Sequence, residues 1–282
     1  MRLSVLVPAY REERTIGELL RRVVALDLSS VAVEVEVIVC DDGSDDNTAA
    51  EVRSVQCWND SIRLVSHPRN RGKGLAIRTA LAVAAGDYVL IQDADLEYEV
   101  EDYCGLVAAV QSGAEVVYGS RFRRRAFPRG MCLVSFLANR LLTATANFLF
   151  GLHLTDEATC LKLFKTDLLR SLQLTCERFE FCSEVTAKLG LIGVPIVEVP
   201  VRYQARSVRD GKKVRWTDGV EAFRTLLQVH ARRKFPTKPT REMLGVGIGA
   251  NPVATRALGT VVLDSRSVDA DSGSAGQVLL KP

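Results

Sequence analysis

The chain alternates short runs of apolar, β-branched residues with longer segments in which apolar positions recur every three or four residues. Leu3–Val7 is an apolar run closed by Pro8, a pattern typical of a strand. Glu12–Leu28 places Ile16, Leu19, Leu20, Val23 and Val24 on one helical face. Further strands are predicted at Val35–Cys40, Ile62–Ser66, Tyr88–Gln92 and Glu115–Gly119, and further helices end near Val55, cover Leu75–Ala85 and lie around Asp102–Gln111.

Strands separated by helices predict right-handed crossovers and a mainly parallel sheet, so we expect an α/β fold. Ligands of such sheets bind at the carboxyl ends of the strands. Polar phrases follow four of the predicted strands. They are Pro8-Ala9-Tyr10, Asp41-Asp42, Asp93-Ala94-Asp95 and Gly119-Ser120-Arg121. We therefore expect one edge of the sheet to be the binding edge.

Asp93-Ala94-Asp95 follows the buried type of strand directly. Side chains spaced by one residue project to the same side of a strand, so the two carboxylates lie together. Carboxylate oxygens suit Mg²⁺ or Mn²⁺, and such an ion neutralises a diphosphate leaving group. A solvated turn is the alternative for an isolated Asp-x-Asp.

Asp41 and Asp42 end another predicted strand. Their carboxylates are suited to accept hydrogen bonds from a nucleobase or a ribose hydroxyl. An ordinary Asx-turn that caps the next helix is the alternative. The glycine fingerprint of dinucleotide enzymes and the P-loop spacing of ATPases are both missing, which disfavours those two classes.

Composition narrows the class of protein further. The 37 basic and 34 acidic residues give a net charge of +3, too balanced for a general nucleic-acid binder. The seven cysteines have no metal-ligand spacing, and the chain starts on a strand instead of a signal peptide, so we expect reduced thiols and a cytosolic location. Residues 235–282 carry no aromatic residue after Phe235 and are predicted to be a disordered tail.

The second half combines basic loops with an apolar segment. Two clusters, 121–129 and 206–213, are rich in Arg and Lys and indicate a phosphate-bearing second substrate. Met131–Leu154 is apolar but contains Arg140, which argues against a membrane span. We expect an amphipathic helix packed on the sheet, or one inserted shallowly at a membrane surface.

Several of these phrases, in this order, resemble glycosyltransferase family 2 and its GT-A nucleotide-binding fold. The likeness covers residues 1–234 and narrows to the branch typified by dolichol-phosphate mannosyltransferase and bacterial polyprenyl-phosphate sugar transferases. The phrases are Val5–Glu13, Val39–Ser44, Asn70–Gly74, Asp93–Glu97, Gly119–Phe122, Leu154–Phe164, Glu198–Val201 and Arg206–Lys213.

The resemblance implies a site divided between two halves, with residues 1–120 binding the nucleotide sugar and residues 121–234 the acceptor. On the donor side it assigns the nucleoside pocket, the metal ligands Asp93 and Asp95, and neighbouring contacts. The remaining donor-side residues are Pro8, Tyr10, Glu12, Cys40, Asp42, Ala94 and Glu97.

On the acceptor side the resemblance implies basic residues around a phosphate, namely Arg121, Arg129, Arg206 and Lys212. Asp156 falls where relatives carry an acid near the sugar, and we expect it to be a base or a metal-side carboxylate. Catalysis is assigned to Asp95, Asp156 and Arg121.

The implied function is an inverting, Mg²⁺- or Mn²⁺-dependent transfer of a sugar from a GDP- or UDP-linked donor to a polyprenyl phosphate. The enzyme would bind peripherally to the cytosolic face of a membrane, alone or through a separate anchoring subunit. Two alternatives stay open. One is the same chemistry with a glycan or protein hydroxyl as acceptor, and the other is a catalytically silent partner that binds nucleotide sugars.

Overall fold

A computed structural model describes residues 1–28, 33–206, 213 and 216–232. Within these residues seven strands form one sheet in the order β3-β2-β1-β4-β6-β5-β7. All strands but β6 run in the same direction, and β6 is antiparallel to both its neighbours. The strands are β1 (Arg2–Ala9), β2 (Glu34–Asp41), β3 (Ile62–Ser66), β4 (Tyr88–Ile91), β5 (Val116–Ser120), β6 (Lys162–Lys165) and β7 (Val197–Pro200). The prediction of an α/β fold with a mainly parallel sheet is confirmed.

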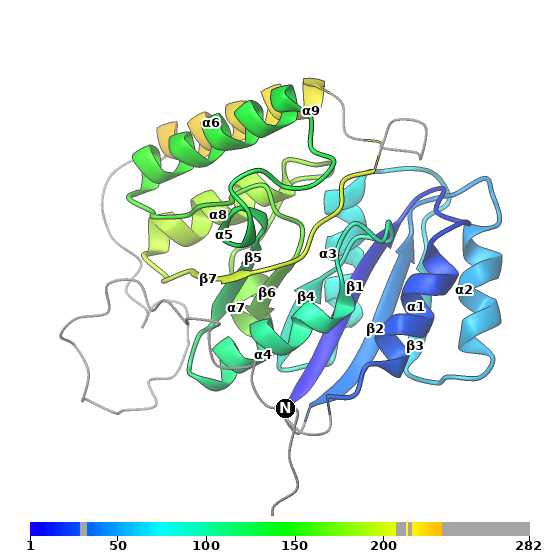
Figure 1. The fold of residues 1–282 in the computed structure, drawn as a ribbon. Helices are drawn as coiled ribbons and strands as arrows, with labels where there is room; N and C mark the ends of the chain where they lie inside the picture. The colour runs from blue at the N-terminus through cyan, green and yellow to red at the C-terminus, as the bar shows by residue number, and fades with distance from the viewer. Residues whose placement is uncertain (29–32, 207–212, 214–215, 233–282) are drawn as a thin grey trace, which may run out of the picture. The chain divides into compact units, whose positions relative to one another are not determined.

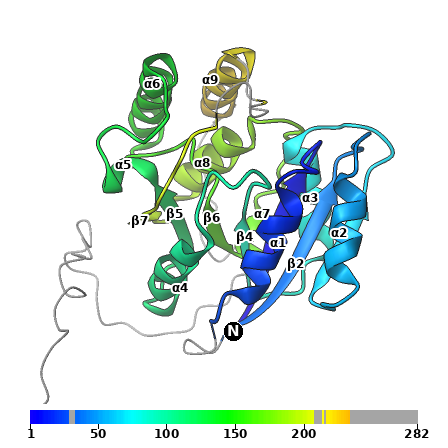
Figure 2. The ribbon, with the colours of Figure 1, turned by 45° about the vertical axis from the view of Figure 1, so that its right-hand side comes forward.

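Helices cover the sheet as the crossover rule requires. Figures 1 and 2 show α1 and α2 on one face of the β1–β3 half and α3 on the opposite face. The helices are α1 (Ile16–Ala25), α2 (Thr48–Gln56), α3 (Lys73–Val83), α4 (Tyr103–Gln111), α5 (Arg121–Arg124), α6 (Leu133–Phe150), α7 (Thr166–Ser171), α8 (Phe181–Ile192) and α9 (Trp216–Ala231), with a 3₁₀ turn η2 at Val100–Asp102.

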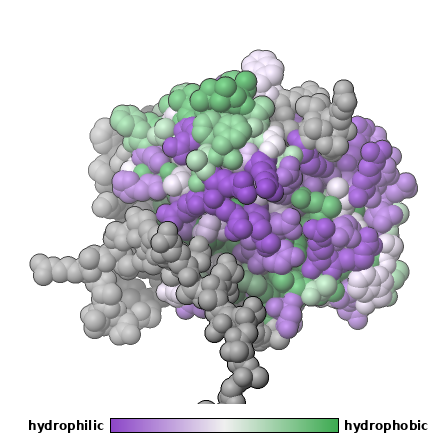
Figure 3. All heavy atoms as spheres, in the orientation of Figure 1, coloured by the Kyte–Doolittle hydropathy of each residue, from purple (hydrophilic) through white to green (hydrophobic). Residues whose placement is uncertain are grey.

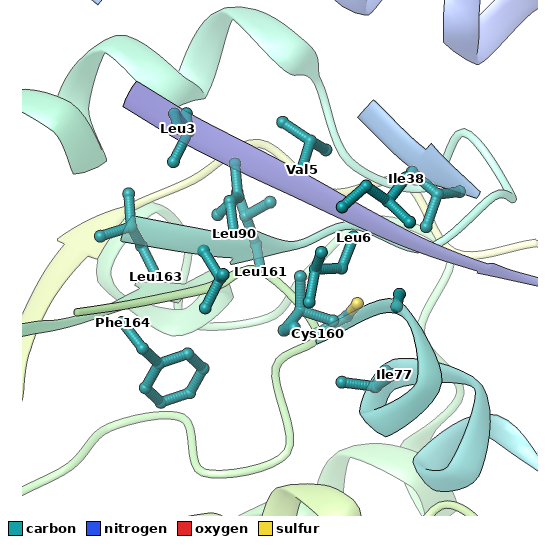
Figure 4. Close-up of a cluster of buried hydrophobic side chains, with 14 of the residues drawn as sticks. Leu3, Val5, Leu6, Ile38, Ile77, Leu90, Cys160, Leu161, Leu163 and Phe164 are labelled. Carbon is teal, nitrogen blue, oxygen red and sulfur yellow. The ribbon is translucent and has the colours of Figure 1, made fainter. Parts of the chain in front are cut away.

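One hydrophobic core joins both halves of the described chain. Leu6 and Leu90 from the first half and Leu163 and Phe164 from β6 are all fully or almost fully buried in the same cluster (Figure 4). Insertion of β6 between β4 and β5 causes this continuity, because its side chains reach the cores under both neighbours. The predicted tail, 235–282, lies outside the described residues.

The apolar segment of the second half forms α6, but not in the predicted place. Helix α6 packs on α8 and α9 instead of on the sheet, and it lies beside α9 in both ribbon views (Figures 1 and 2). Only Thr143 and Ala146 of its eighteen residues are buried. The expectation of a helix packed on the sheet is therefore wrong.

Candidate active site

The carboxyl ends of β1, β2 and β4 lie next to one another. In the sheet β1 pairs with β2 on one side and β4 on the other, in parallel register. Tyr10, Asp42 and Asp93 therefore follow three adjacent strand ends, because parallel strands end at the same edge. The structure brings together the donor-side residues that the sequence motifs single out.

Asp93 and Asp95 each form an ion pair with a basic side chain of the protein. The Asp93 Oδ1 atom lies 2.6 Å from the Lys73 Nζ atom, which comes from the first turn of α3. The Asp95 Oδ2 atom lies 3.2 Å from the Arg206 Nη2 atom, which comes from a segment 111 residues further along the chain. Asp95 also accepts a hydrogen bond from the Glu97 backbone N–H at 3.1 Å, which orders the turn after β4.

Asp95 lies in an environment that disfavours its charge. Burial raises the pKa of Asp95 to about 7, and the negative charges of Asp93 and Glu97 act in the same direction. A divalent cation would relieve this repulsion, and carboxylate oxygens are the donors that Mg²⁺ and Mn²⁺ accept. The described residues contain no cluster of three or more His, Cys, Asp or Glu side chains able to hold a metal. Two carboxylates, Asp93 and Asp95, fit an ion that takes its other ligands from outside the protein, such as diphosphate oxygens and water.

A strap of residues 201–206 crosses this edge of the sheet. Figure 1 shows it in yellow, leaving β7 toward the ends of β4 and β1. Its backbone N–H groups donate to the carbonyl oxygens of Glu97 at 2.9 Å and Arg129 at 3.1 Å. The strap thus joins the turn after β4 to the basic loop of the second half.

Glu12 anchors the end of the strap. Its carboxylate accepts two hydrogen bonds from Arg206, at 3.0 and 3.1 Å, and one from Lys213 at 2.5 Å. Burial alone would lower the pKa of Arg206, but the hydrogen bonds to Glu12 and the charge of Asp95 raise it. Lys212 lies outside the described residues. Lys213, from the same basic cluster, contacts the site through Glu12.

The expected nucleoside-pocket residues divide into two groups. Pro8 and Tyr10 are half-buried at the end of β1. Cys40 and Asp42 are buried. Burial, with the charges of Asp42 and Asp41, raises the pKa of the Cys40 thiol to about 12, and its nearest polar contact is His67 at 3.7 Å. Cys40 therefore packs in the core, with its thiol away from solvent.

Asp42 organises the loop before α3. One of its carboxylate oxygens accepts from the Arg71 backbone N–H at 2.9 Å, and the other accepts from the Gly72 N–H at 2.7 Å. The first oxygen also lies 2.7 Å from the Nδ1 atom of His67. These contacts place Lys73, two residues later, opposite Asp93.

Arg121 and Asp156 form a closed pair beneath the acceptor side. The carboxylate accepts from the Arg121 backbone N–H at 3.0 Å, from its Nε at 2.7 Å and from its Nη2 at 2.7 Å. Asp156 is 0% exposed and Arg121 is 7% exposed. Both Asp156 oxygens are committed to Arg121, so this geometry fits a residue that positions Arg121 and does not fit a general base.

Other residues complete the acceptor side. Arg129 is exposed beside the strap, and Ala94 is buried between the two acids. Arg121 also stacks its guanidinium 5.1 Å from the ring centroid of Tyr203 and donates to the Asn139 side chain of α6 at 3.4 Å.

Sequence reasoning assigned no role to Lys73, Tyr203 or Asn139. For Lys73 a signal was present, because it stands in the Asn70–Gly74 phrase that resembles the family. Tyr203 and Asn139 have no comparable signal, since their approach to Arg121 depends on how distant segments pack.

Comparison with known proteins decides the family. Residues 4–173 match the sequence model of glycosyl transferase family 2. The chain belongs to glycosyltransferase family 2. The resemblance drawn from the motifs is thereby confirmed, and the family match covers the donor-side residues.

Among curated relatives, the low-salt glycan biosynthesis hexosyltransferase Agl6 of Haloferax volcanii is 29% identical over 206 residues. That alignment covers 72% of this chain and 48% of the relative, so the chain spans about half the length of the curated relative it matches.

Solved structures share the fold. Glucosyl-3-phosphoglycerate synthase from Mycobacterium tuberculosis, in complex with UDP, aligns with a TM-score of 0.62 at 22% identity, over 84% of this chain and 81% of that chain. A complex of the same protein with Mn²⁺, UDP-glucose and phosphoglyceric acid aligns with a TM-score of 0.61 at 22% identity, over 84% and 81% of the two chains. The prediction of a GT-A type fold is confirmed.

Proposed function

We propose that this family 2 protein transfers a sugar, with inversion, from a nucleotide-sugar donor to a polyprenyl phosphate at the cytosolic face of a membrane. The observation that carries the acceptor class is the Arg121–Asp156 pair. Asp156 is the candidate base, and its two oxygens are occupied by Arg121. A phosphate acceptor is already ionised near neutral pH and does not need a protein base, whereas a sugar or protein hydroxyl does.

The charges at the carboxyl edge of the sheet also support a nucleotide-sugar donor and a phosphate acceptor. Lys73, Arg206 and Lys213 lie against Asp93, Asp95 and Glu12, so cations from both halves meet where donor and acceptor phosphates would meet. Charged hydrogen-bond donors already held in place stabilise developing negative charge without reorganisation. The strap then orients the acceptor side relative to the donor side.

Asp93 and Asp95 would hold the divalent cation. When bound, Mg²⁺ or Mn²⁺ supplies neutralisation of the departing nucleoside diphosphate. Lys73 and Arg206 neutralise the same carboxylates in the absence of substrate. Complexes of the mycobacterial relative contain Mn²⁺ or Mg²⁺ together with UDP, which favours the same cofactors for this chain.

The direct test incubates the full chain with Mn²⁺, a phosphorylated polyprenol and a panel of radiolabelled nucleotide sugars. We expect label in the organic phase from one donor, lost with Asp95→Asn and retained with Asp60→Asn, an exposed acid that belongs to none of the motifs. Parallel reactions supply phosphoglyceric acid or a glycan hydroxyl as acceptor.

The outcomes separate the candidate functions. Label in the glycan would favour the hydroxyl acceptor, and label in phosphoglycerate would favour a small phosphorylated acid. Donor binding with no transfer to any acceptor would favour the silent partner. Each of these results would overturn the polyprenyl-phosphate proposal.

A further inference from the structure

Helix α6 has its apolar face turned away from the protein. Five of its large apolar side chains are 56–88% exposed, and they form a stripe along the helix. The stripe consists of Leu133, Val134, Leu137, Leu141 and Phe148. In Figure 3 hydrophobic residues gather at the top of the molecule, where Figure 1 places α6, above a band of hydrophilic residues. A surface helix of a soluble protein exposes polar and charged residues on this side instead.

The opposite face of α6 points into the protein and carries polar side chains beside apolar ones, Leu142, Ala146, Leu149 and Phe150, that pack with α8 and α9. Asn139, Thr143 and Asn147 are spaced by four residues, which puts them on one face, and the apolar stripe lies on the other side of the helix. Asn147 exchanges two hydrogen bonds with the backbone of Leu154, at 2.8 and 2.9 Å. The Thr143 hydroxyl accepts from the Glu157 backbone N–H at 3.0 Å. These polar contacts, together with the packing of Ala146 on α8 and α9, therefore hold α6 with its exposed apolar stripe outward.

This polar stripe excludes one use of the helix. Helix α6 is long and apolar enough to cross a membrane by length and composition, with about 27 Å over its 18 residues at the usual rise. A crossing helix would have to break the contacts of Asn139, Thr143 and Asn147 and bury these groups in hydrocarbon, which costs several kcal/mol for each unsatisfied group. The arrangement fits a helix that lies along a surface.

Charge decides between a lipid surface and a second protein. Residues 121–154 contain no Asp or Glu and six arginines, which are Arg121, Arg123, Arg124, Arg125, Arg129 and Arg140. Arg124, Arg125 and Arg140 are exposed. A symmetric dimer through this face would oppose arginine clusters of the same sign. Anionic headgroups complement the same arginines.

We propose that the outer face of α6 docks on a leaflet containing anionic lipids, with its axis along the membrane plane. The apolar stripe inserts among the acyl chains, and the exposed Arg124, Arg125 and Arg129 contact the headgroups. The inner face connects α6 to the candidate active site. Asn139 accepts a hydrogen bond from Arg121, while Thr143 and Asn147 form hydrogen bonds with the segment that contains Asp156. The docking face is inferred without reference to the acceptor. Only its suggested purpose, to bring Arg121 to the level of a lipid phosphate, rests on the proposed function.

Binding to vesicles is measurable without any sugar transfer. The full chain is sedimented with sucrose-loaded phosphatidylcholine vesicles, with and without phosphatidylglycerol. We expect binding that requires the anionic lipid and weakens with salt. Leu137→Asp with Leu141→Asp should lower the partition coefficient by at least ten-fold, since each change removes about one buried side chain of apolar area.

Trp58→Asp is the matched control. Trp58 is 58% exposed just after the end of α2. Trp58→Asp therefore introduces the same acid at an exposed apolar position elsewhere on the protein, and we expect this variant to bind vesicles like the wild type. Unchanged far-UV circular dichroism and thermal midpoint confirm that the α6 variant is folded. The apolar side chains of Leu137 and Leu141 form no hydrogen bond that these substitutions could remove.

The results distinguish this inference from the proposed function. Wild-type binding that Leu137→Asp/Leu141→Asp leaves intact, or absence of binding to anionic vesicles, would overturn the docking face. A dimer in sedimentation equilibrium that the same variant dissociates would assign the face to a second copy instead. Vesicle binding without transfer to polyprenyl phosphate would leave the docking face standing and reject the acceptor. Transfer to a short, water-soluble polyprenyl phosphate without vesicle binding would do the opposite.

Discussion

Substitution of Asp156 by Asn tests whether this acid positions Arg121 or acts as a base. The wild-type carboxylate accepts three hydrogen bonds from Arg121, all of 3.0 Å or less, in a fully buried setting. Asn preserves the shape but replaces one oxygen with an N–H group that faces a guanidinium. Removing one partner of a buried ion pair costs about 3–5 kcal/mol, and the retained acceptor places Asn near the lower value.

Urea unfolding monitored by circular dichroism measures this change, together with steady-state kinetics on the labelled acceptor. We expect the free energy of unfolding to fall by about 3 kcal/mol. Turnover should slow without being abolished, and the loss should appear mainly in KM for the acceptor, because Arg121 is held less firmly. The pH at which activity falls on the acidic side should be the same in Asp156→Asn as in the wild type.

Asp45→Asn is the control. Asp45 and Arg11 form a pair with comparably short distances, 2.6 Å to both nitrogens, but both side chains are more than half exposed. Water screens such a pair, so we expect stability and activity to stay at wild-type values.

A fully stable Asp156→Asn protein with no turnover would refute the positioning role and assign Asp156 as the base of a hydroxyl-acceptor enzyme. The double variant Arg121→Met/Asp156→Leu gives a second check. If the pair is structural, removing both charges should recover a large part of the stability lost with Asp156→Asn alone.

Three further predictions follow from buried groups and from one glycine. Burial alone would raise the pKa of Glu184, but hydrogen bonds from neighbouring groups lower it to about 2. It should therefore contribute about 3 kcal/mol above pH 4.5, lost as pH falls toward 2, and Glu184→Gln should flatten the stability–pH curve there. Gly43 has φ +71, and an added Cβ would lie 2.4 Å from a backbone atom. Gly43→Ala should thus lower the thermal midpoint by many degrees, whereas Gly105→Ala, with open space in α4, should raise it slightly. Lys162 is fully buried and donates to the Glu157 backbone carbonyl at 2.7 Å, and its positive charge opposes the rise that burial causes in the pKa of the Glu157 carboxyl. Lys162→Met should lower the denaturant midpoint strongly, and Glu157→Gln in the same chain should recover part of it, while additive losses would contradict a Glu157–Lys162 pair.

The alternation of apolar runs and helical periods predicted the first five strands because each pattern is local. Leu3–Val7 and Tyr88–Gln92 can be buried on both faces only within a sheet that helices cover, so their composition already implies parallel crossovers. The polar residues that end these strands could be assigned to one edge for the same reason. The donor side, with Asp93 and Asp95 at its centre, could therefore be predicted from the sequence.

The sequence by itself determined the α/β class, the binding edge and the family motifs, since strand direction and side-chain alternation are properties of short segments. The tertiary structure alone decided which charges neutralise each other. Asp156 meets Arg121 across 35 residues and Glu12 meets Arg206 across 194, and such pairings depend on how segments pack. It also decided which face of α6 is inside. Periodicity cannot show which side of α6 meets the protein. The hydrogen bonds offered by the 154–157 segment and the packing of Ala146 on α8 and α9 decide this, and they leave the stripe from Leu133 to Phe148 outside.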